Sequence, residues 1–253
     1  MPLAARPGSG GPYRSRVGAV LVAAGESRRM GGMDKVFAPI LGLPLIAHTV
    51  AAFEACTAVD DLVLVVAPGA LEQAEALARE QGWRKLRAIC LGGARRQDSV
   101  RTGLERLPPC QWVVVHDGAR PCLEPALIER GLEAAESGAA VAAVPVADTI
   151  KVVSPEQMVL STLDRSGLWA VQTPQVFRYQ LLWEAHQRCQ DTVTDDAAMV
   201  ERLGHPVRVF PGSPSNLKVT TPEDLVMAEA LLKLRQLNQP TTHAAVHPHR
   251  HRV

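Results

Sequence analysis

The chain alternates short apolar runs with amphipathic stretches of helical length as far as Val146. Runs of this kind, rich in β-branched residues, are typical of buried strands, and the longer periodic stretches are typical of helices. Strands are predicted over Val17–Ala23, Asp61–Ala67, Leu86–Leu91, Trp112–His116 and Ala139–Val146. Helices are predicted over Pro44–Ala55, Ala70–Gln81, Gln97–Leu107 and Pro125–Ser137. The alternation predicts an α/β fold with a doubly wound, mostly parallel sheet that helices cover on both faces.

This pattern breaks after Val146, where two β-prone segments replace the alternation. Thr149–Val153 and Met158–Leu163 flank a turn that contains Pro155, which predicts a hairpin. Because the hairpin lies outside the regular alternation, residues 148–170 are expected to project as a β-arm. Apolar residues on an exposed hairpin need a cover, and a second copy of the chain is the simplest one. The arm therefore predicts a homodimer.

Beyond the arm the chain returns to helices and short strands. The predicted helices are Arg178–Arg188 and Asp195–Leu203, and the predicted strands are Pro206–Phe210 and a short one ending at Asn216–Thr220. A last helix follows Thr221, a residue suited to the N-cap position, with Pro222 as its first residue. Asp224 is then the third residue, where a carboxylate is favoured by the helix dipole.

Composition adds limits to this picture. The chain has 253 residues, of which 47% are hydrophobic and 21% charged, values that are ordinary for a globular protein. One domain is assigned to residues 16–238, with a disordered Gly/Pro-rich lead-in at 1–15 and a disordered His-rich tail at 239–253. The net charge of +1 gives no general attraction to nucleic acid or to an anionic membrane. No segment resembles a signal peptide or approaches the roughly 20 apolar residues of a membrane span.

The five cysteines are odd in number and scattered, without a C-x-x-C pair. This argues against a disulfide framework or a zinc site and predicts a cytoplasmic protein in a reducing compartment.

The first predicted strand runs directly into a glycine-rich loop. Gly25 begins the loop, Arg28 and Arg29 supply two positive charges, and Lys35 follows six residues later. Glycines allow close approach of the backbone to a phosphate chain, and the basic side chains supply charge. The spacing fits neither the Walker motif nor the dinucleotide fingerprint. The loop is interpreted as a polyphosphate site, with a plain solvated loop as the alternative.

A second group of polar residues follows the strand at Trp112–His116. Asp117 lies at the carboxyl end of that strand, where it can hold Mg²⁺ or a ribose hydroxyl, and Arg120 can clamp a further phosphate. The alternative is a structural turn in which Asp117 caps the backbone and Arg120 is its surface partner.

Three further segments supply weaker candidates. Gly92 and Gly93 precede a predicted helix start, where backbone N–H groups can bind an anion or the polar edge of a base. The adjacent Arg95 and Arg96 are interpreted as a solvated charge pair. Lys218 could point into the same crevice, although a lone lysine is usually a surface residue. Basic groups at strand ends with few candidate bases fit attack on phosphorus, where positioning and charge stabilisation dominate.

From about Val17 to Leu232 the sequence resembles the 2-C-methyl-D-erythritol 4-phosphate cytidylyltransferases of the non-mevalonate isoprenoid pathway. The shared motifs are Ala23-Ala24-Gly25 with Arg28-Arg29-Met30 and Lys35, Gly92-Gly93 with Asp98-Ser99-Val100, His116–Pro121, Asp148–Lys151, Asp164–Trp169, Thr173–Gln175, Thr194–Asp196 and Asn216–Thr220. Several motifs in family order are far more specific than any one of them. The resemblance implies a Rossmann-like sheet of the nucleotidyltransferase type.

The resemblance also implies a Mg²⁺-dependent reaction in which a substrate phosphate oxygen attacks the α-phosphorus of CTP and expels pyrophosphate. In such a reaction Arg29, Lys35 and Lys218 would be catalytic and would stabilise the charge on the reacting phosphate. The CTP-binding residues implied are Ala23, Ala24, Gly25, Gly92, Ala94, Ser99 and Asp117. Asp117 would also lie beside the metal and the hydroxyls of the second substrate.

For methylerythritol phosphate, the resemblance implies binding by Asp117, Arg120 and two residues of the partner's arm that correspond to Thr149 and Arg165. A homodimer would then be needed to complete each site. One departure is Asp34, because the family commonly has proline before the lysine that corresponds to Lys35.

Two alternatives stay open at this point. A ribitol 5-phosphate cytidylyltransferase would share the nucleotide motifs and differ in the pocket for the alcohol. A non-catalytic nucleotide sensor would keep the fold without the reaction, although retention of Arg29, Lys35 and Lys218 weighs against it. A dinucleotide-dependent oxidoreductase is disfavoured because the fingerprint is missing.

Overall fold

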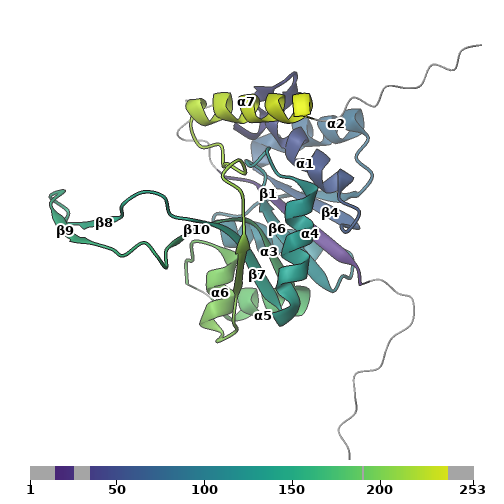
Figure 1. Ribbon diagram of the computed structural model, residues 1–253. Coiled ribbons are helices and arrows are strands. Elements are labelled where there is room, and N and C mark those ends of the chain that lie inside the picture. Colours follow the sequence, from purple (N-terminus) through teal and green to yellow (C-terminus); the bar gives the residue numbers. More distant parts are fainter. Residues whose placement is uncertain (1–14, 26–34, 190, 239–253) are drawn as a thin grey trace, which may run out of the picture.

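The computed structural model describes residues 15–25, 35–189 and 191–238. Its centre is a seven-stranded sheet with strand order β11-β7-β10-β6-β1-β4-β5 (Figure 1). The strands are β1 Val17–Ala23, β4 Asp61–Val66, β5 Leu86–Leu91, β6 Trp112–Asp117, β7 Ala139–Pro145, β10 Trp169–Arg178 and β11 Arg208–Pro211. All neighbours in this sheet pair in parallel except β10, which runs antiparallel to both β6 and β7. The mostly parallel α/β sheet predicted from the sequence is confirmed.

Helices cover both faces of this sheet. They are α1 Leu45–Ala55, α2 Leu71–Gln81, α3 Arg96–Arg106, α4 Pro125–Ala134, α5 Tyr179–Arg188, α6 Asp196–Arg202 and α7 Pro222–Asn238. Ala19 and Leu21 of β1 belong to a core with residues of α1, α2 and α4, whereas Val20 belongs to a core with residues of α3, α5 and α6. Successive side chains of a strand point to opposite faces, so one β-branched strand anchors both layers.

Two sequence-based expectations about elements were wrong. β10 was not predicted, although it is the longest strand of the sheet and pairs with β6 and β7. Residues 216–220 were expected to end a short strand, but they form no strand in the structure. The Asn216 side chain and backbone hydrogen bonds, among them one from the Val219 N–H to the Ala119 carbonyl at 2.8 Å, hold that segment instead. The N-cap predicted for α7 is present, because the Asp224 N–H donates to Thr221 Oγ1.

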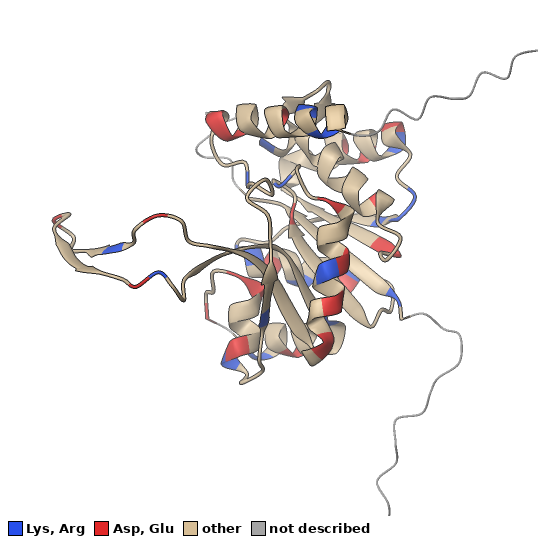
Figure 2. Ribbon diagram, viewed as in Figure 1, with Lys and Arg blue, Asp and Glu red and all other residues tan. Residues whose placement is uncertain are grey.

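The arm consists of β8 Lys151–Val153, β9 Val159–Thr162 and the connecting segments that join them to β7 and β10. It extends away from the body, as Figure 1 shows, and both acidic and basic residues are spread along it, as Figure 2 shows. Large apolar side chains on it are exposed, among them Met158 at 67% and Leu160 at 66%. The projecting β-arm is therefore confirmed.

Parts of the N- and C-terminal predictions fall at 1–14 and 239–253, which lie outside the described residues. Among the helices that the structure does describe, none is long and apolar enough to cross a bilayer.

Candidate active site

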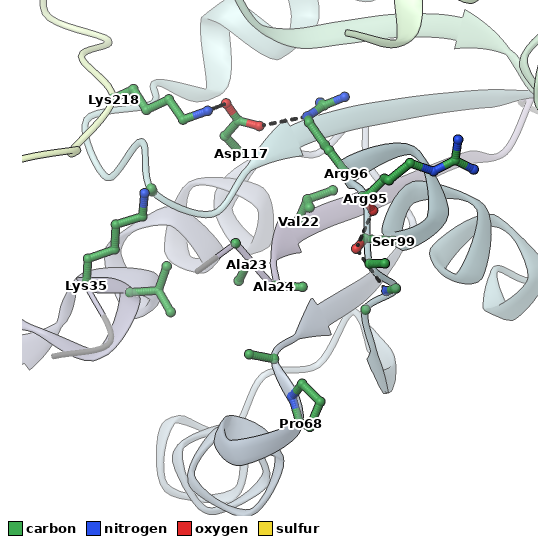
Figure 3. Close-up of a pocket in the computed structure, with 17 residues that line it drawn as sticks. Val22, Ala23, Ala24, Lys35, Pro68, Arg95, Arg96, Ser99, Asp117 and Lys218 are labelled. Carbon is green, nitrogen blue, oxygen red and sulfur yellow. Dashed lines mark hydrogen bonds and ion pairs between the residues drawn. The ribbon is translucent and has the colours of Figure 1, made fainter. Parts of the chain in front are cut away.

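A cavity of about 710 Å³ lies beyond the carboxyl ends of β1 and β6, beside the start of α3. This is the edge at which doubly wound sheets bind ligands, and the volume is in the range of small-molecule sites. The described residues that line it are Val22, Ala23, Ala24, Gly25, Lys35, Val36, Ala67, Pro68, Gly92, Gly93, Ala94, Arg95, Arg96, Ser99, Asp117, Ala119 and Lys218. Figure 3 shows how their side chains surround the space.

The floor of the cavity is made where the end of β1 meets the loop before α3. A Cβ atom added to Gly92 would lie 2.2 Å from the Cβ of Ala24 and 2.7 Å from Ser99 Oγ. Any larger residue at Gly92 would push these segments apart. Glycine is therefore required here for a close approach of two backbones, and the backbone of Ala24–Gly25 is left open to a ligand.

Ser99 fixes the shape of the loop between β5 and α3. Its hydroxyl accepts a hydrogen bond from the Gly93 N–H at 3.1 Å and donates to the Arg95 carbonyl at 3.2 Å. At the helix start, the Asp98 carboxylate accepts from the Arg95 N–H at 3.0 Å. The loop is thus held so that the backbone around Ala94 faces the cavity at the N-terminus of α3.

Asp117, the last residue of β6, lies among three basic side chains. Its Oδ2 atom is 2.8 Å from Lys218 Nζ and 3.8 Å from Arg120 Nε, and its Oδ1 atom is 3.4 Å from Arg96 Nε. Burial alone would raise the pKa of this carboxyl, but Arg96, Lys218 and Arg120 together hold the pKa well below its usual range. Asp117 is therefore ionised throughout the neutral range.

Arg96 is a site residue that sequence reasoning missed. It lines the cavity, and its Nη1 atom lies 2.5 Å from Oδ2 of Asp196, the first residue of α6, which is fully buried. Burial would raise the pKa of Asp196, but Arg96 and His186 bring about a net lowering. Because Asp196 lies a hundred positions further along the chain, the local pattern indicated only a solvated Arg95–Arg96 pair. That interpretation holds for Arg95 and is wrong for Arg96.

Arg120 takes the opposite position from the one expected. It was predicted to clamp a phosphate, but only 8% of it is exposed and it is not among the residues that line the cavity. Its Nη1 atom donates to the Asn216 carbonyl at 2.6 Å. In this chain Arg120 therefore joins the turn after Asp117 to the loop that carries Asn216, and its contact with substrate stays a prediction.

The remaining candidates divide into three groups. Lys35, Lys218, Ala23, Ala24, Gly25, Gly92, Ala94, Ser99 and Asp117 all line the cavity as the sequence led us to expect. Arg29 and Asp34 lie outside the described residues. Thr149 and Arg165 are exposed on the arm and do not line this cavity, and the Arg165 guanidinium donates to the Ala147 carbonyl.

The arrangement has the chemistry of an anion site. Among the lining residues that the structure describes are four basic side chains and a single carboxylate, Asp117. The neighbouring His116 is fully buried, and burial lowers its pKa to about 3. Its imidazole ring is therefore neutral at neutral pH. The cavity is thus equipped to stabilise negative charge rather than to move protons.

Comparison with known proteins agrees with this geometry. The family model described as "IspD: 2-C-methyl-D-erythritol 4-phosphate cytidylyltransferase" matches residues 17–234. A 2-C-methyl-D-erythritol 4-phosphate cytidylyltransferase of Dehalococcoides mccartyi is 55% identical over 86% of this chain and 96% of its own length.

Solved structures give the same result. The 2-C-methyl-D-erythritol 4-phosphate cytidylyltransferase of Thermus thermophilus has a TM-score of 0.71 at 37% identity, covering 85% of this chain and 98% of its own. A 4-diphosphocytidyl-2C-methyl-D-erythritol synthase of Anaerococcus prevotii has a TM-score of 0.77 at 26% identity, covering 87% and 96%. The chain belongs to the 2-C-methyl-D-erythritol 4-phosphate cytidylyltransferase family.

Proposed function

We propose that this protein transfers CMP from CTP to 2-C-methyl-D-erythritol 4-phosphate, giving 4-diphosphocytidyl-2-C-methyl-D-erythritol and pyrophosphate for isoprenoid precursor biosynthesis. The observation that carries the proposal is the cavity at the ends of β1 and β6, where Lys35 and Lys218 lie with Asp117 in a chain of this family. Nucleotidyl transfer depends mainly on such positioning and charge.

The transfer balances without a general base. An anionic oxygen of the substrate phosphate forms a bond to the α-phosphorus of CTP, and the bond from that phosphorus to the bridging oxygen of the leaving group breaks. The electron pair leaves with pyrophosphate. Negative charge grows on the α-phosphate oxygens, and Lys35 and Lys218 are assigned to stabilise it. Arg29 is assigned the same role from the glycine loop.

Recognition of the base is assigned to the backbone before α3. Gly92 leaves room close to Ala24, Ser99 fixes the loop, and the N–H groups around Ala94 are available to the polar edge of cytosine. Because the loop is held tightly, we expect it to favour a pyrimidine over the larger purine.

We also propose that Mg²⁺ binds with the triphosphate at Asp117. The described residues contain no cluster of three or more potential ligands, but Mg²⁺ is usually bound by one or two carboxylates together with substrate phosphates. The buried, ionised Asp117 on the cavity wall fits that pattern. A divalent ion held there would neutralise part of the charge of the triphosphate.

The second substrate is assigned to a site completed by another copy of the chain. Thr149 and Arg165 lie on the arm, away from the cavity of their own chain, and the arm exposes Met158, Val159 and Leu160 to solvent. A homodimer in which each arm reaches the other subunit's cavity would cover these apolar residues and deliver the two polar ones. The cytoplasm is the proposed location, in keeping with the five free cysteines.

One assay tests the substrate assignment. The purified protein is incubated with CTP and Mg²⁺ and with methylerythritol phosphate or ribitol 5-phosphate in separate reactions, and pyrophosphate is measured. We expect release with methylerythritol phosphate. Release of pyrophosphate with ribitol 5-phosphate alone would identify that compound as the substrate. CTP binding without pyrophosphate release in either reaction would indicate a nucleotide sensor.

A further inference from the structure

Lys218 lies on a loop that no strand pairing holds. Residues 212–220 connect β11 to α7 without forming a strand, and 40% of the Lys218 side chain is exposed. The ammonium group nevertheless lies 2.8 Å from the Asp117 carboxylate. The position of Lys218 must therefore depend on contacts that its neighbours in the loop make with the body of the protein.

Asn216, two residues before Lys218, makes the contacts on one side of it, while on the other side the Val219 N–H donates to the Ala119 carbonyl at 2.8 Å. Asn216 is 1% exposed, and its Nδ2 atom donates to the Thr173 carbonyl at 2.7 Å and to Gln172 Oε1 at 3.3 Å. Its own carbonyl accepts from Arg120 Nη1 at 2.6 Å. Buried hydrogen bonds of this kind are costly to lose, because each unpaired group keeps its desolvation penalty. Asn216 is thus fixed from two directions.

Thr173 connects these contacts to the other half of the ion pair. Its Oγ1 atom accepts a hydrogen bond from the Asp117 N–H at 3.0 Å, while its carbonyl accepts from Asn216. One residue of β10 therefore positions both Asp117 and the segment that carries Lys218. The adjacent Gln172 strengthens the connection, since its Nε2 atom donates to the Ser213 carbonyl at 2.9 Å.

We propose that Asn216 is a positioning residue that, through Thr173, holds the Lys218 ammonium beside Asp117 at the place where the phosphate reacts. The proposal rests on the catalytic role assigned to Lys218 in the proposed function. A positioning role for Asn216 differs from a purely structural role in one respect. If Asn216 acts through Lys218, its loss has no further effect on catalysis once Lys218 is gone.

A double-mutant cycle measures this dependence. Turnover of CTP with methylerythritol phosphate is determined for the wild type, Asn216→Ala, Lys218→Ala and the double variant. Misplacing a catalytic group costs up to about 100-fold, so Asn216→Ala alone is expected to lower kcat by about 10- to 100-fold. The double variant is expected to be as slow as Lys218→Ala, because residues that share one interaction are not additive. Multiplicative losses in the double variant would overturn the proposal.

Ser215→Ala is the matched control. Ser215 is in the same loop, and its hydroxyl lies 2.7 Å from that of Ser213 rather than on Thr173 or Asp117. It is expected to keep the kcat of the wild type. Thermal denaturation of every variant then shows whether the substitutions in the loop leave the protein folded.

A second measurement needs no catalysis. The chain has five lysines (Lys35, Lys85, Lys151, Lys218 and Lys233), so ¹³C-dimethylation gives an NMR spectrum with few resonances. Lys218→Arg identifies the Lys218 resonance, and Asp117→Asn shows where it moves when the carboxylate is lost. Asn216→Ala is expected to shift the resonance towards that position, and Ser215→Ala to leave it unchanged.

The two measurements separate the two proposals. A wild type that releases no pyrophosphate would defeat the proposed function, while the Lys218 resonance would still report on Asn216. A Lys218 resonance in Asn216→Ala that coincides with that of the wild type would overturn the positioning role, whatever reaction the protein catalyses.

Discussion

Asp117 is the residue around which the charges of the cavity are arranged. Lys218 and Arg96 approach different oxygens of its carboxylate, and Arg120 lies further away beneath it. In the absence of nucleotide this carboxylate balances part of the surrounding positive charge. A bound triphosphate would compete for the same cations. The basic side chains could then pair with the phosphates of the ligand in place of Asp117.

At this scale the first prediction concerns Lys35. Replacing it with alanine removes a cation assigned to the reacting phosphate, and kcat is expected to fall by at least ~100-fold. Lys233→Ala is the control, because that lysine pairs with Glu229 on α7 and does not line the cavity. Steady-state kinetics of both variants decide the point, and a kcat for Lys35→Ala near that of the wild type would remove Lys35 from the mechanism.

A second residue-scale prediction concerns the buried pair of Arg96 and Asp196. Asp196→Asn removes the carboxylate 2.5 Å from Arg96 and leaves Arg96 with the more distant Asp117, so it is expected to lower the free energy of unfolding by about 2 kcal/mol at pH 7. Urea denaturation measures the difference from the wild type, with Asp191→Asn as control, since 81% of that side chain is exposed. Equal stability of Asp196→Asn and the wild type would contradict the importance of the pair.

The pH dependence of that difference has a definite sign. The folded-state pKa of Asp196 is lowered, so its contribution is complete above the unfolded-state pKa, which is about 3.9. As the pH falls below about 4 and towards the folded-state value, protonation removes the contribution. The stability gap between the wild type and Asp196→Asn should therefore persist at neutral pH and narrow only in acid. A gap that closes between pH 7 and 5 would assign the difference to a group other than Asp196.

The same residues show how far sequence reasoning reaches. The cavity residues at strand ends were predictable, because parallel strands bring their carboxyl ends to one edge. The different fates of Arg96 and Arg120 were not, because each depends on a partner remote in sequence: Asp196 for Arg96, and the Asn216 carbonyl for Arg120. A local sequence pattern indicates which side chains lie at a strand end, but not which remote segment supplies their partners.

At the scale of elements, the alternating strands and helices were predicted and β10 was not. The strand contains Pro174, and its pairing with β7 shifts between Val171 and Gln175. Proline within an apolar run argues against a central strand, so the usual sequence signal points the wrong way here. β10 is tolerated in the sheet because the irregular pairing falls at this proline. Its position matters for the site, since Thr173 Oγ1 accepts a hydrogen bond from the N–H of Asp117, which lines the cavity.

A further prediction concerns Arg165 on the arm. If Arg165 serves the cavity of the other subunit, Arg165→Ala and Lys35→Ala chains that are separately impaired should regain activity when they are exchanged into mixed dimers. Each mixed dimer then has one intact site, and random exchange should restore about a quarter of wild-type activity. Mixing two preparations of the same variant is the control. No recovery after verified subunit exchange would argue that each chain completes its own site.

For the whole molecule, we expect the arm to mediate the proposed homodimer. Met158 and Leu160 are exposed by two thirds and are expected to be buried against the second subunit. Sedimentation should show a dimer for the wild type and a shift towards monomer for a Met158→Glu/Leu160→Glu variant, because burying two charges in an apolar contact is unfavourable.

Leu237→Glu provides the comparison for that experiment. Leu237 is 80% exposed near the end of α7, so a charge there should leave the dimer intact. A wild type that sediments as a monomer at the concentrations of the activity assay would contradict the shared site.

The reaction proposed for this cavity is attack of the substrate phosphate on the α-phosphorus of CTP. The most direct measurement is ³¹P NMR of a reaction that contains the protein, CTP, Mg²⁺ and methylerythritol phosphate. The predicted result is loss of the monophosphate signal, with pyrophosphate and the two coupled signals of a diphosphate diester appearing together. An unchanged monophosphate signal, whether or not CTP is hydrolysed, would contradict attack by the substrate phosphate.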